Sequence, residues 1–162
     1  TCLPSPAASD AVMREMLPYV ADGKIWMEMS TTDEAEVKRL GAEVIEGGGT
    51  ATDCPVSGGC HRADTGNISI FAGCERTTFE TILPLLIRMG RRVLHSGALC
   101  SASILKVITN FMATANLVSC TEALTVAKES GVDLNIAYEA MKISSGTSFV
   151  HETESQVILN GS

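Results

Sequence analysis

Residues 101–130 contain neither glycine nor proline, and this stretch constrains the fold more than any other part of the chain. At a rise of about 1.5 Å per residue, a helix of this length would be about 45 Å long. Because such a length exceeds the mean for globular proteins, we expect a helix shared by two packing units. Apolar residues surround most of the predicted helix, and a helix that is apolar on all sides is expected to be buried.

A single lysine, Lys106, lies near the start of this helix, and Asn110 follows it one turn later. The i,i+4 spacing puts both side chains on one face of the helix. A lysine among apolar residues is costly unless its amine has a polar partner or a water-filled cleft. The alternative is a packed stem with the amine at the surface, and the spacing taken alone favours this alternative.

The composition indicates a folded chain and narrows the classes of partner. The chain has 162 residues, 45% of them hydrophobic and 19% charged, which is enough for one domain or for joined parts of two. Its net charge of −7 argues against nucleic acid and against an anionic membrane surface as partners. No apolar run approaches the roughly twenty residues of a membrane span, and no secretory signal is visible. Because the chain begins with Thr1, we expect the true N-terminus upstream.

The six cysteines, at positions 2, 54, 60, 74, 100 and 120, form no CxxC pair and have no histidine at metal-ligand spacing. We therefore predict free thiols and no metal site. Scattered thiols in a chain with a large core favour a reducing compartment, so we expect an intracellular protein of the cytoplasm or the mitochondrial matrix.

Helices and strands alternate over the first hundred residues, which is typical of a parallel α/β sheet. The expected elements are a helix at 7–20, a strand at 24–29, a helix at 33–46, a strand at 50–56, a polar loop at 60–66, a strand at 67–71, a helix at 74–89 and a strand at 92–95. Pro84 is expected to kink the last of these helices or to mark a second start. After residue 131 only helices are expected, at 134–142 and 147–159.

Two loops have the composition of binding sites. Ser57, Gly58 and Gly59 follow a predicted strand, and two glycines with a serine hydroxyl can form a nest for a carboxylate. The alternative is an ordinary tight turn, which such residues form more often. Ser30 and Thr31 lie between a strand and a helix, where α/β sheets gather their ligands, although a helix cap is the favoured alternative.

In combination these motifs resemble the β-hydroxyacid dehydrogenases. The substrate-binding signature of that family resembles residues 53–59, Asp-Cys-Pro-Val-Ser-Gly-Gly, together with Ala63 and Gly66. Lys106 and Asn110 match the catalytic Lys-x-x-x-Asn of the family, and residues 144–146 resemble its Ser-Ser-Gly. Leu3-Pro4 and the Glu-Met-Ser-Thr at 28–31 resemble its cofactor-binding segments. The 6-phosphogluconate dehydrogenases are similar but usually have His-Asn where this chain has Thr109 and Asn110.

The resemblance implies the C-terminal part of a Rossmann-type domain, joined by a long helix to the start of an all-α domain. Residues 1–96 would be the partial NAD(P)-binding domain without its first βαβ unit, and residues 97–162 the long interdomain helix and the beginning of the all-α domain. The cofactor would be NAD or NADP, contacted by Leu3, Pro4 and Thr31. Because the glycine-rich dinucleotide fingerprint is absent, and because the sequence stops soon after the all-α region begins, we expect a chain that is truncated at both ends.

The resemblance also implies roles in catalysis. Ser57, Gly58 and Gly59 would hold the substrate carboxylate, Lys106 would act as general acid and base, and Asn110 would orient it. Before the lysine the family usually reads Gly-x-Gly, whereas this chain has Cys100 and Ala102, whose side chains could crowd the cleft.

The sequence leaves two functions open. The first is reversible oxidation of a short 3-hydroxy acid, such as 3-hydroxyisobutyrate, to its semialdehyde. The alternative is a non-catalytic assembly module that keeps the fold but not cofactor binding. In either case we expect a homo-oligomer, because a half-built sheet exposes an unpaired edge.

Overall fold

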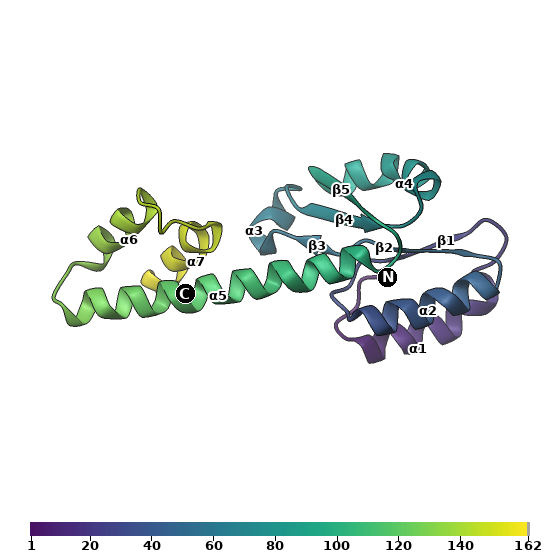
Figure 1. Cartoon of the computed structure of the whole chain (residues 1–162), viewed down its shortest axis with the longest axis horizontal. Coiled ribbons are helices and arrows are strands. Elements are labelled where there is room, and N and C mark those ends of the chain that lie inside the picture. The colour runs from purple at the N-terminus through teal and green to yellow at the C-terminus, as the bar shows by residue number, and fades with distance from the viewer. Residues whose placement is uncertain (162) are drawn as a thin grey trace. The chain divides into compact units, whose positions relative to one another are not determined.

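Figure 1 shows the computed structural model, which describes residues 1–161 apart from the side chain of His61. The chain divides into two compact units, Thr1–Ile108 and Thr109–Ser162. This division falls within one long helix, α5 (Ser101–Glu129). The family resemblance predicts a boundary at residues 96–97 instead, and that boundary stays a prediction.

The first unit is an α/β domain. In the second unit, the residues that the structure describes form helices and no strands. The first unit comprises α1 (Pro6–Met16), a 3₁₀ turn η1 (Leu17–Tyr19), β1 (Ile25–Glu28), α2 (Glu34–Glu46), β2 (Thr50–Asp53), β3 (Val56–Ser57), α3 (Gly59–Asp64), β4 (Ser69–Gly73), α4 (Arg76–Met89), β5 (Arg92–Gly97) and the first part of α5. The second unit comprises the rest of α5, α6 (Leu134–Lys142) and α7 (Phe149–Leu159). The predicted fold class is confirmed.

The sheet combines parallel and antiparallel pairs. β1 pairs with β2 and β4 pairs with β5, both in parallel. β4 runs antiparallel to β2 and β3 in one continuous register, because Asp53 lies opposite Gly73 and Ser57 lies opposite Ser69. β2 and β3 are thus one strand interrupted at Pro55. Since β1 ends opposite Asp53, this strand carries Ser57 about 13 Å beyond the carboxyl end of β1.

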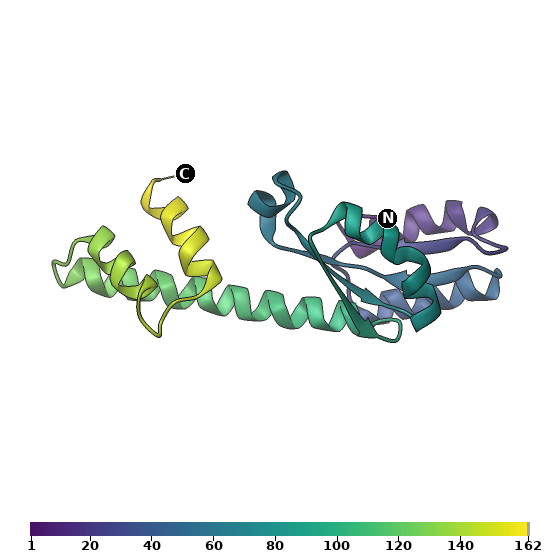
Figure 2. The same ribbon diagram turned by 90° about the horizontal axis from the view of Figure 1, so that it is seen from above.

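Helices cover both faces of the sheet. Figures 1 and 2 show α1 and α2 on one face and α4 on the other. Side chains alternate between the two faces along each strand. One core therefore joins α1 and α2 to β1 and β2, through Met13, Val20, Trp26, Leu40, Val44 and Ala51. The other joins α4 to β4, through Cys54, Ile70, Ala72, Cys74, Phe79, Ile82 and Leu86.

Two local expectations need correction. Residues 60–66 were expected to form a loop, yet α3 (Gly59–Asp64) is a short helix. It has no side-chain cap and is too short to show an apolar face, so the sequence carries no signal for it. A second helix start at Pro84 is also wrong, because α4 runs through this residue as one helix. Pro84 is exposed, so its ring is directed away from the core.

The expectation that the long helix is buried is wrong. Phe111 is 70% exposed, Val126 is 65% exposed, and several other apolar side chains of α5 are about half exposed. By length and composition alone, α5 would also be long and apolar enough to cross a membrane, which corrects the expectation that no stretch is. The apolar pattern of α5 indicates that its surface packs against another element, but the pattern does not identify that element.

In the second unit, polar residues fix the ends of the two shorter helices. Asp133 caps α6 by accepting a hydrogen bond from the Asn135 N–H (2.9 Å), and Ser148 caps α7. His151 is fully buried between them, with Nε2 3.0 Å from the Tyr138 carbonyl oxygen and Nδ1 3.1 Å from Ser155 Oγ. This histidine therefore packs α7 against α6.

Candidate active site

The N-terminal residues and the loop after β1 lie together. The Met29 N–H donates to the Thr1 carbonyl oxygen (2.8 Å), and the Leu3 N–H donates to Ser30 Oγ (2.7 Å). Pro4 and Thr31 are both exposed beside this contact. The structure therefore brings together Leu3, Pro4 and Thr31, at the carboxyl end of β1, where α/β sheets bind ligands.

Glu28, which stands where the family has aspartate, holds the loop after β1 in place through hydrogen bonds. Its carboxylate is buried and accepts hydrogen bonds from the Ser30 N–H (2.7 Å) and from Thr1 Oγ1 (2.9 Å). The cap of α2 is Asp33, which accepts from the Glu36 N–H (2.9 Å). Ser30 and Thr31 are therefore not the helix cap that the sequence left open.

The turn at residues 57–59 requires its two glycines. Gly58 has φ +135° and Gly59 has φ +68°, backbone conformations that other residues rarely adopt. A Cβ at Gly58 would lie 2.9 Å from Arg62 Cδ, whereas a Cβ at Gly59 would meet open space. Ser57 is half-buried at the end of β3 and Gly59 is exposed, so this turn is accessible to a ligand.

A buried carboxylate, Asp53, connects β2 to α5, and no motif in the sequence predicts this role. Asp53 is fully buried; its Oδ1 accepts from the Cys100 N–H (2.9 Å), and its Oδ2 accepts from Ser103 N–H (2.7 Å) and Ser103 Oγ (2.9 Å). These are donors of the first turn of α5, so Asp53 acts as its N-terminal cap. Burial raises the pKa of Asp53, and the hydrogen bonds from Ser103 and Cys100 oppose that rise.

Lys106 lies in the second turn of this capped helix and is half-buried. Burial lowers the pKa of its amine below the ordinary value for lysine. Asn110 lies one turn further along the same helix and is exposed. Asp53 thus joins the segment that leads to Ser57 with the segment that leads to Lys106, while the catalytic roles of these residues stay predictions.

The residues that replace the family's glycines are packed inside the domain. Cys100 has φ +78°, a conformation typical of glycine, and only 7% of the residue is exposed. Its Sγ lies 3.8 Å from the Glu34 carbonyl oxygen at the start of α2, and Ala102 is fully buried. The chain therefore keeps the backbone shape of a glycine turn while holding the Cys100 thiol against α2.

An α/β sheet with exposed loops at the carboxyl ends of its strands is typical of dinucleotide-binding proteins. Residues 1–97 match the model for the NAD binding domain of 6-phosphogluconate dehydrogenase. Residues 100–162 match the model for the NAD-binding segment of NADP-dependent 3-hydroxyisobutyrate dehydrogenase. The chain belongs to the β-hydroxyacid dehydrogenase family, whose cofactor is NAD or NADP.

Individual relatives agree with this family. The chain is 31% identical over 97% of its length to rat mitochondrial 3-hydroxyisobutyrate dehydrogenase, covering 48% of that protein. It is 28% identical over 85% of its length to the NAD-dependent L-serine dehydrogenase of Pseudomonas aeruginosa, covering 46% of it. The structure of Mycobacterium tuberculosis 3-hydroxyisobutyrate dehydrogenase with L-serine has a similar fold (TM-score 0.86, 21% identity, 94% of this chain and 53% of that one). The chain spans about half the length of the curated relatives it matches.

The residues present fit part of a dinucleotide site. Pyrophosphate groups bind at a glycine-rich turn of the first βαβ unit, and this sequence has no such fingerprint. Pro4 and Thr31 are exposed beside the Leu3–Ser30 hydrogen bond, and their contact with another portion of the cofactor stays a prediction. Among the described residues, no group of three or more histidine, cysteine, aspartate or glutamate side chains could hold a metal ion.

Proposed function

We propose that this chain is the part of an NAD(P)-dependent dehydrogenase that carries the substrate turn and the catalytic lysine. The observation that carries the proposal is Lys106, half-buried and with a lowered pKa, on a helix whose first turn is held by Asp53. The same strand that contains Asp53 leads into the turn at residues 57–59. In this proposal, the hydrogen bonds of buried Asp53 connect the helix of the proton-transfer group to the strand that leads to the anion-binding turn.

We propose a short 3-hydroxy acid as the substrate. The relatives' names include 3-hydroxyisobutyrate and L-serine, which share a carboxylate and a hydroxyl group two carbons away from it. In this proposal the Ser57 hydroxyl and the backbone N–H groups of Gly58 and Gly59 hold the carboxylate. The rat relative is named as mitochondrial, whereas Pseudomonas has no such compartment, so the compartment of this chain stays a prediction.

Lys106 would move the proton of the reacting hydroxyl group. Its neutral amine accepts this proton during oxidation, and its ammonium form returns the proton during reduction. Asn110 orients the amine from the next turn of the helix. The nicotinamide, when bound beside Leu3, Pro4 and Thr31, supplies the hydride acceptor. Because burial lowers the pKa of Lys106, more of the amine is neutral near physiological pH than for an exposed lysine.

Substitution of Lys106 tests this proposal. Lys106→Ala should reduce turnover by roughly 10²–10⁴-fold, the usual contribution of a proton-transfer group. Lys128→Ala, at an exposed lysine of the same helix, is the matched control and should leave turnover unchanged. In the unsubstituted protein, oxidation should slow as the pH falls through the pKa of Lys106, because the neutral base is then lost. Retained turnover in Lys106→Ala would remove this residue from the mechanism.

A second candidate function is a non-catalytic assembly module, favoured by the exposed apolar side chains of α5. It predicts self-association without cofactor binding. Titration of the chain with NAD and NADP, with sedimentation velocity in parallel, separates the two functions. Saturable cofactor binding at or below millimolar concentration supports the dehydrogenase, and its absence in a chain that self-associates supports the module.

A further inference from the structure

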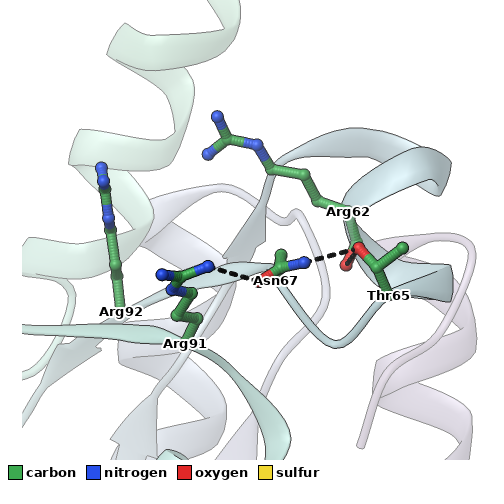
Figure 3. A pocket seen from close by; sticks show the side chains of 5 residues that line it. All are labelled: Arg62, Thr65, Asn67, Arg91 and Arg92. Atoms are coloured by element: carbon green, nitrogen blue, oxygen red, sulfur yellow. Dashed lines mark hydrogen bonds between the residues drawn. The ribbon is translucent and has the colours of Figure 1, made fainter.

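Three arginines surround a pocket that neither the family resemblance nor the proposed mechanism uses. The pocket has a volume of about 300 Å³ and is lined by Arg62, Thr65, Asn67, Arg91 and Arg92 (Figure 3). None of these five described lining residues is acidic, although the chain as a whole carries a net charge of −7. A concentration of positive charge in an acidic protein indicates a site for an anion.

Hydrogen bonds hold the three segments that form this pocket in place. Arg91 Nη1 donates to Asn67 Oδ1 (3.2 Å), and Asn67 Nδ2 donates to Thr65 Oγ1 (2.8 Å), as Figure 3 shows. The backbone repeats these links, because the Asn67 N–H donates to the Arg62 carbonyl oxygen (2.7 Å) and the Arg91 N–H to that of Ile68 (3.0 Å). The backbone of the lining and the side chains of Thr65, Asn67 and Arg91 are therefore held before any ligand arrives, which lowers the entropic cost of binding.

We propose that this pocket binds the phosphoryl group of a small molecule. Guanidinium groups bind phosphate through paired N–H donors, and three such groups line this pocket. The Thr65 hydroxyl and the Asn67 amide add uncharged polar groups at the rim. The volume is at the lower end of the range for small-molecule sites, so it suits a phosphate group with a small organic part.

The pocket adjoins the glycine turn. The aliphatic stem of Arg62 packs against Gly58, where an added Cβ would lie 2.9 Å from Arg62 Cδ. An anion bound by Arg62 would therefore restrict the turn at residues 57–59 as well. Binding itself does not depend on the proposed dehydrogenase activity, since neither Lys106 nor Asn110 lines this pocket.

Titration of the chain with inorganic phosphate at low ionic strength tests the proposal, with chloride at equal ionic strength as the reference. Isothermal titration calorimetry should detect saturable binding, and both Arg91→Gln and Arg62→Gln should raise the Kd at least tenfold. Arg88→Gln is the matched control, because Arg88 is exposed on α4 and does not line the pocket. It should change the Kd less than twofold. Arg91→Lys keeps the charge but loses the paired donors, so its Kd should lie between those of the unsubstituted chain and Arg91→Gln.

A second titration, with phenyl phosphate, separates the two sources of this group. Tighter binding of phenyl phosphate than of inorganic phosphate assigns the pocket to a phosphate ester, and the reverse assigns it to the free ion. The proposal is overturned if phosphate fails to bind, or if the three pocket variants, Arg62→Gln, Arg91→Gln and Arg91→Lys, bind it with the affinity of the unsubstituted chain. Circular dichroism of each variant, expected to match the unsubstituted chain, shows that a raised Kd does not come from unfolding.

Discussion

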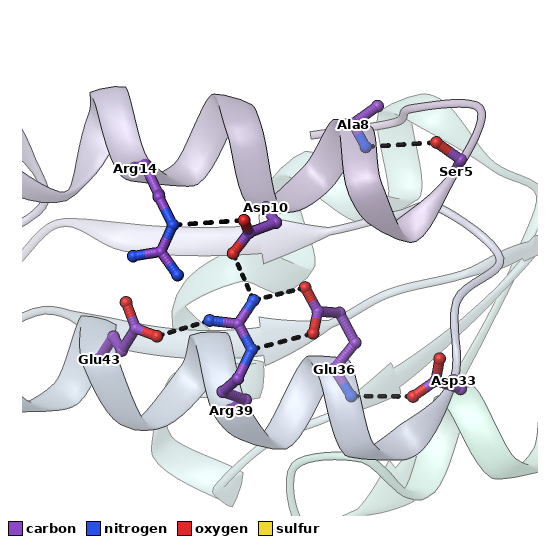
Figure 4. Close-up of polar contacts among 8 residues, drawn as sticks. All are labelled: Ser5, Ala8, Asp10, Arg14, Asp33, Glu36, Arg39 and Glu43. Carbon is purple, nitrogen blue, oxygen red and sulfur yellow. Dashed lines mark hydrogen bonds and ion pairs between the residues drawn. The ribbon is translucent and has the colours of Figure 1, made fainter.

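Two carboxylates connect distant parts of the first unit, one inside the protein and one at its surface. Asp53 is fully buried and joins β2 to the first turn of α5. Asp10 is on α1 and pairs with Arg39 of α2, which also binds Glu36 and Glu43 (Figure 4). Both residues make several polar contacts, so the number of contacts does not distinguish them.

Solvent distinguishes these two sites. Arg39 and Asp10 are 39% and 31% exposed at their side chains, so water and salt compete for both partners. Their pairing still lowers the pKa of Asp10, chiefly through the hydrogen bond from Arg39. Asp53 is buried, so water does not replace a hydrogen-bond partner that is lost there. An N–H group of Cys100 or Ser103 left without its acceptor would then cost its full desolvation free energy. The comparison predicts that small changes at the buried junction cost more than removal of the whole surface pair.

The largest effect is expected from Gly73→Ala. A Cβ at Gly73 would lie 2.2 Å from Asp53 Oδ1 and 3.0 Å from the Ala98 carbonyl oxygen, so the junction must open to admit it. We expect a loss of about 3 kcal/mol or more in the free energy of unfolding, the upper range for overpacking. Urea titration followed by Trp26, the single tryptophan of the chain and part of the first-unit core, measures this loss.

Gly146→Ala is the control for that substitution, because Gly146 is exposed and the nearest atom to its added Cβ is 3.4 Å away. It should leave the Trp26 transition in place. An equal transition for Gly73→Ala would mean that the carboxylate of Asp53 is not held beside this glycine.

Asp53→Asn should have the next largest effect. The amide keeps the shape of the carboxylate but presents a donor to one of the N–H groups at residues 100 and 103. One buried N–H then lacks an acceptor, and we expect a loss of about 1–3 kcal/mol. Asp33→Asn is the control, because asparagine caps a helix about as well as aspartate. The same urea titration reports both variants, and an equal loss in the two would contradict a special role for the buried cap.

Ser103→Ala should have a smaller effect. It removes one hydroxyl donor to Asp53 Oδ2, while the Ser103 N–H still donates to the same oxygen. We expect a loss of about 1 kcal/mol, the usual net contribution of one hydrogen bond. Ser101→Ala is the comparison variant. Ser101 lies in the same turn, but its hydroxyl forms a hydrogen bond with Ser96 and not with Asp53. A loss as large as that of Asp53→Asn would show that the hydroxyl, rather than the backbone, caps the helix.

Arg39→Gln should have the smallest effect, although it removes the centre of the whole surface network. Its loss should be smaller than that of Ser103→Ala and should disappear in 1 M salt. Because the folded-state pKa of Asp10 is lowered, this contribution is present above the ordinary aspartate pKa and is lost as the pH falls through the lowered value. Urea titrations across pH and salt check both trends, and a loss that is insensitive to salt would sink the comparison.

Apart from α3, the order of the helices and strands could be predicted from sequence, because these elements depend on local signals. Asp33, for example, caps α2 as its position three residues before Glu36 predicts. The role of Asp53 could not be predicted in this way. The N-cap position of α5 is Cys100, which has no side-chain acceptor of the usual kind, and the acceptor comes from 47 residues earlier in the chain. The sequence offered only an aspartate inside the strand predicted at residues 50–56, and its burial is a finding of the structure.

The sequence by itself determined the family and the helix that carries Lys106, because motifs and helix-forming patterns are properties of neighbouring residues. The tertiary structure decided that Asp53 caps this helix and that Arg62, Arg91 and Arg92 share one pocket. It also decided that much of the apolar surface of α5 is exposed. Charge pairing and burial depend on which segments contact one another in the folded protein, and hydrophobic periodicity does not specify those contacts.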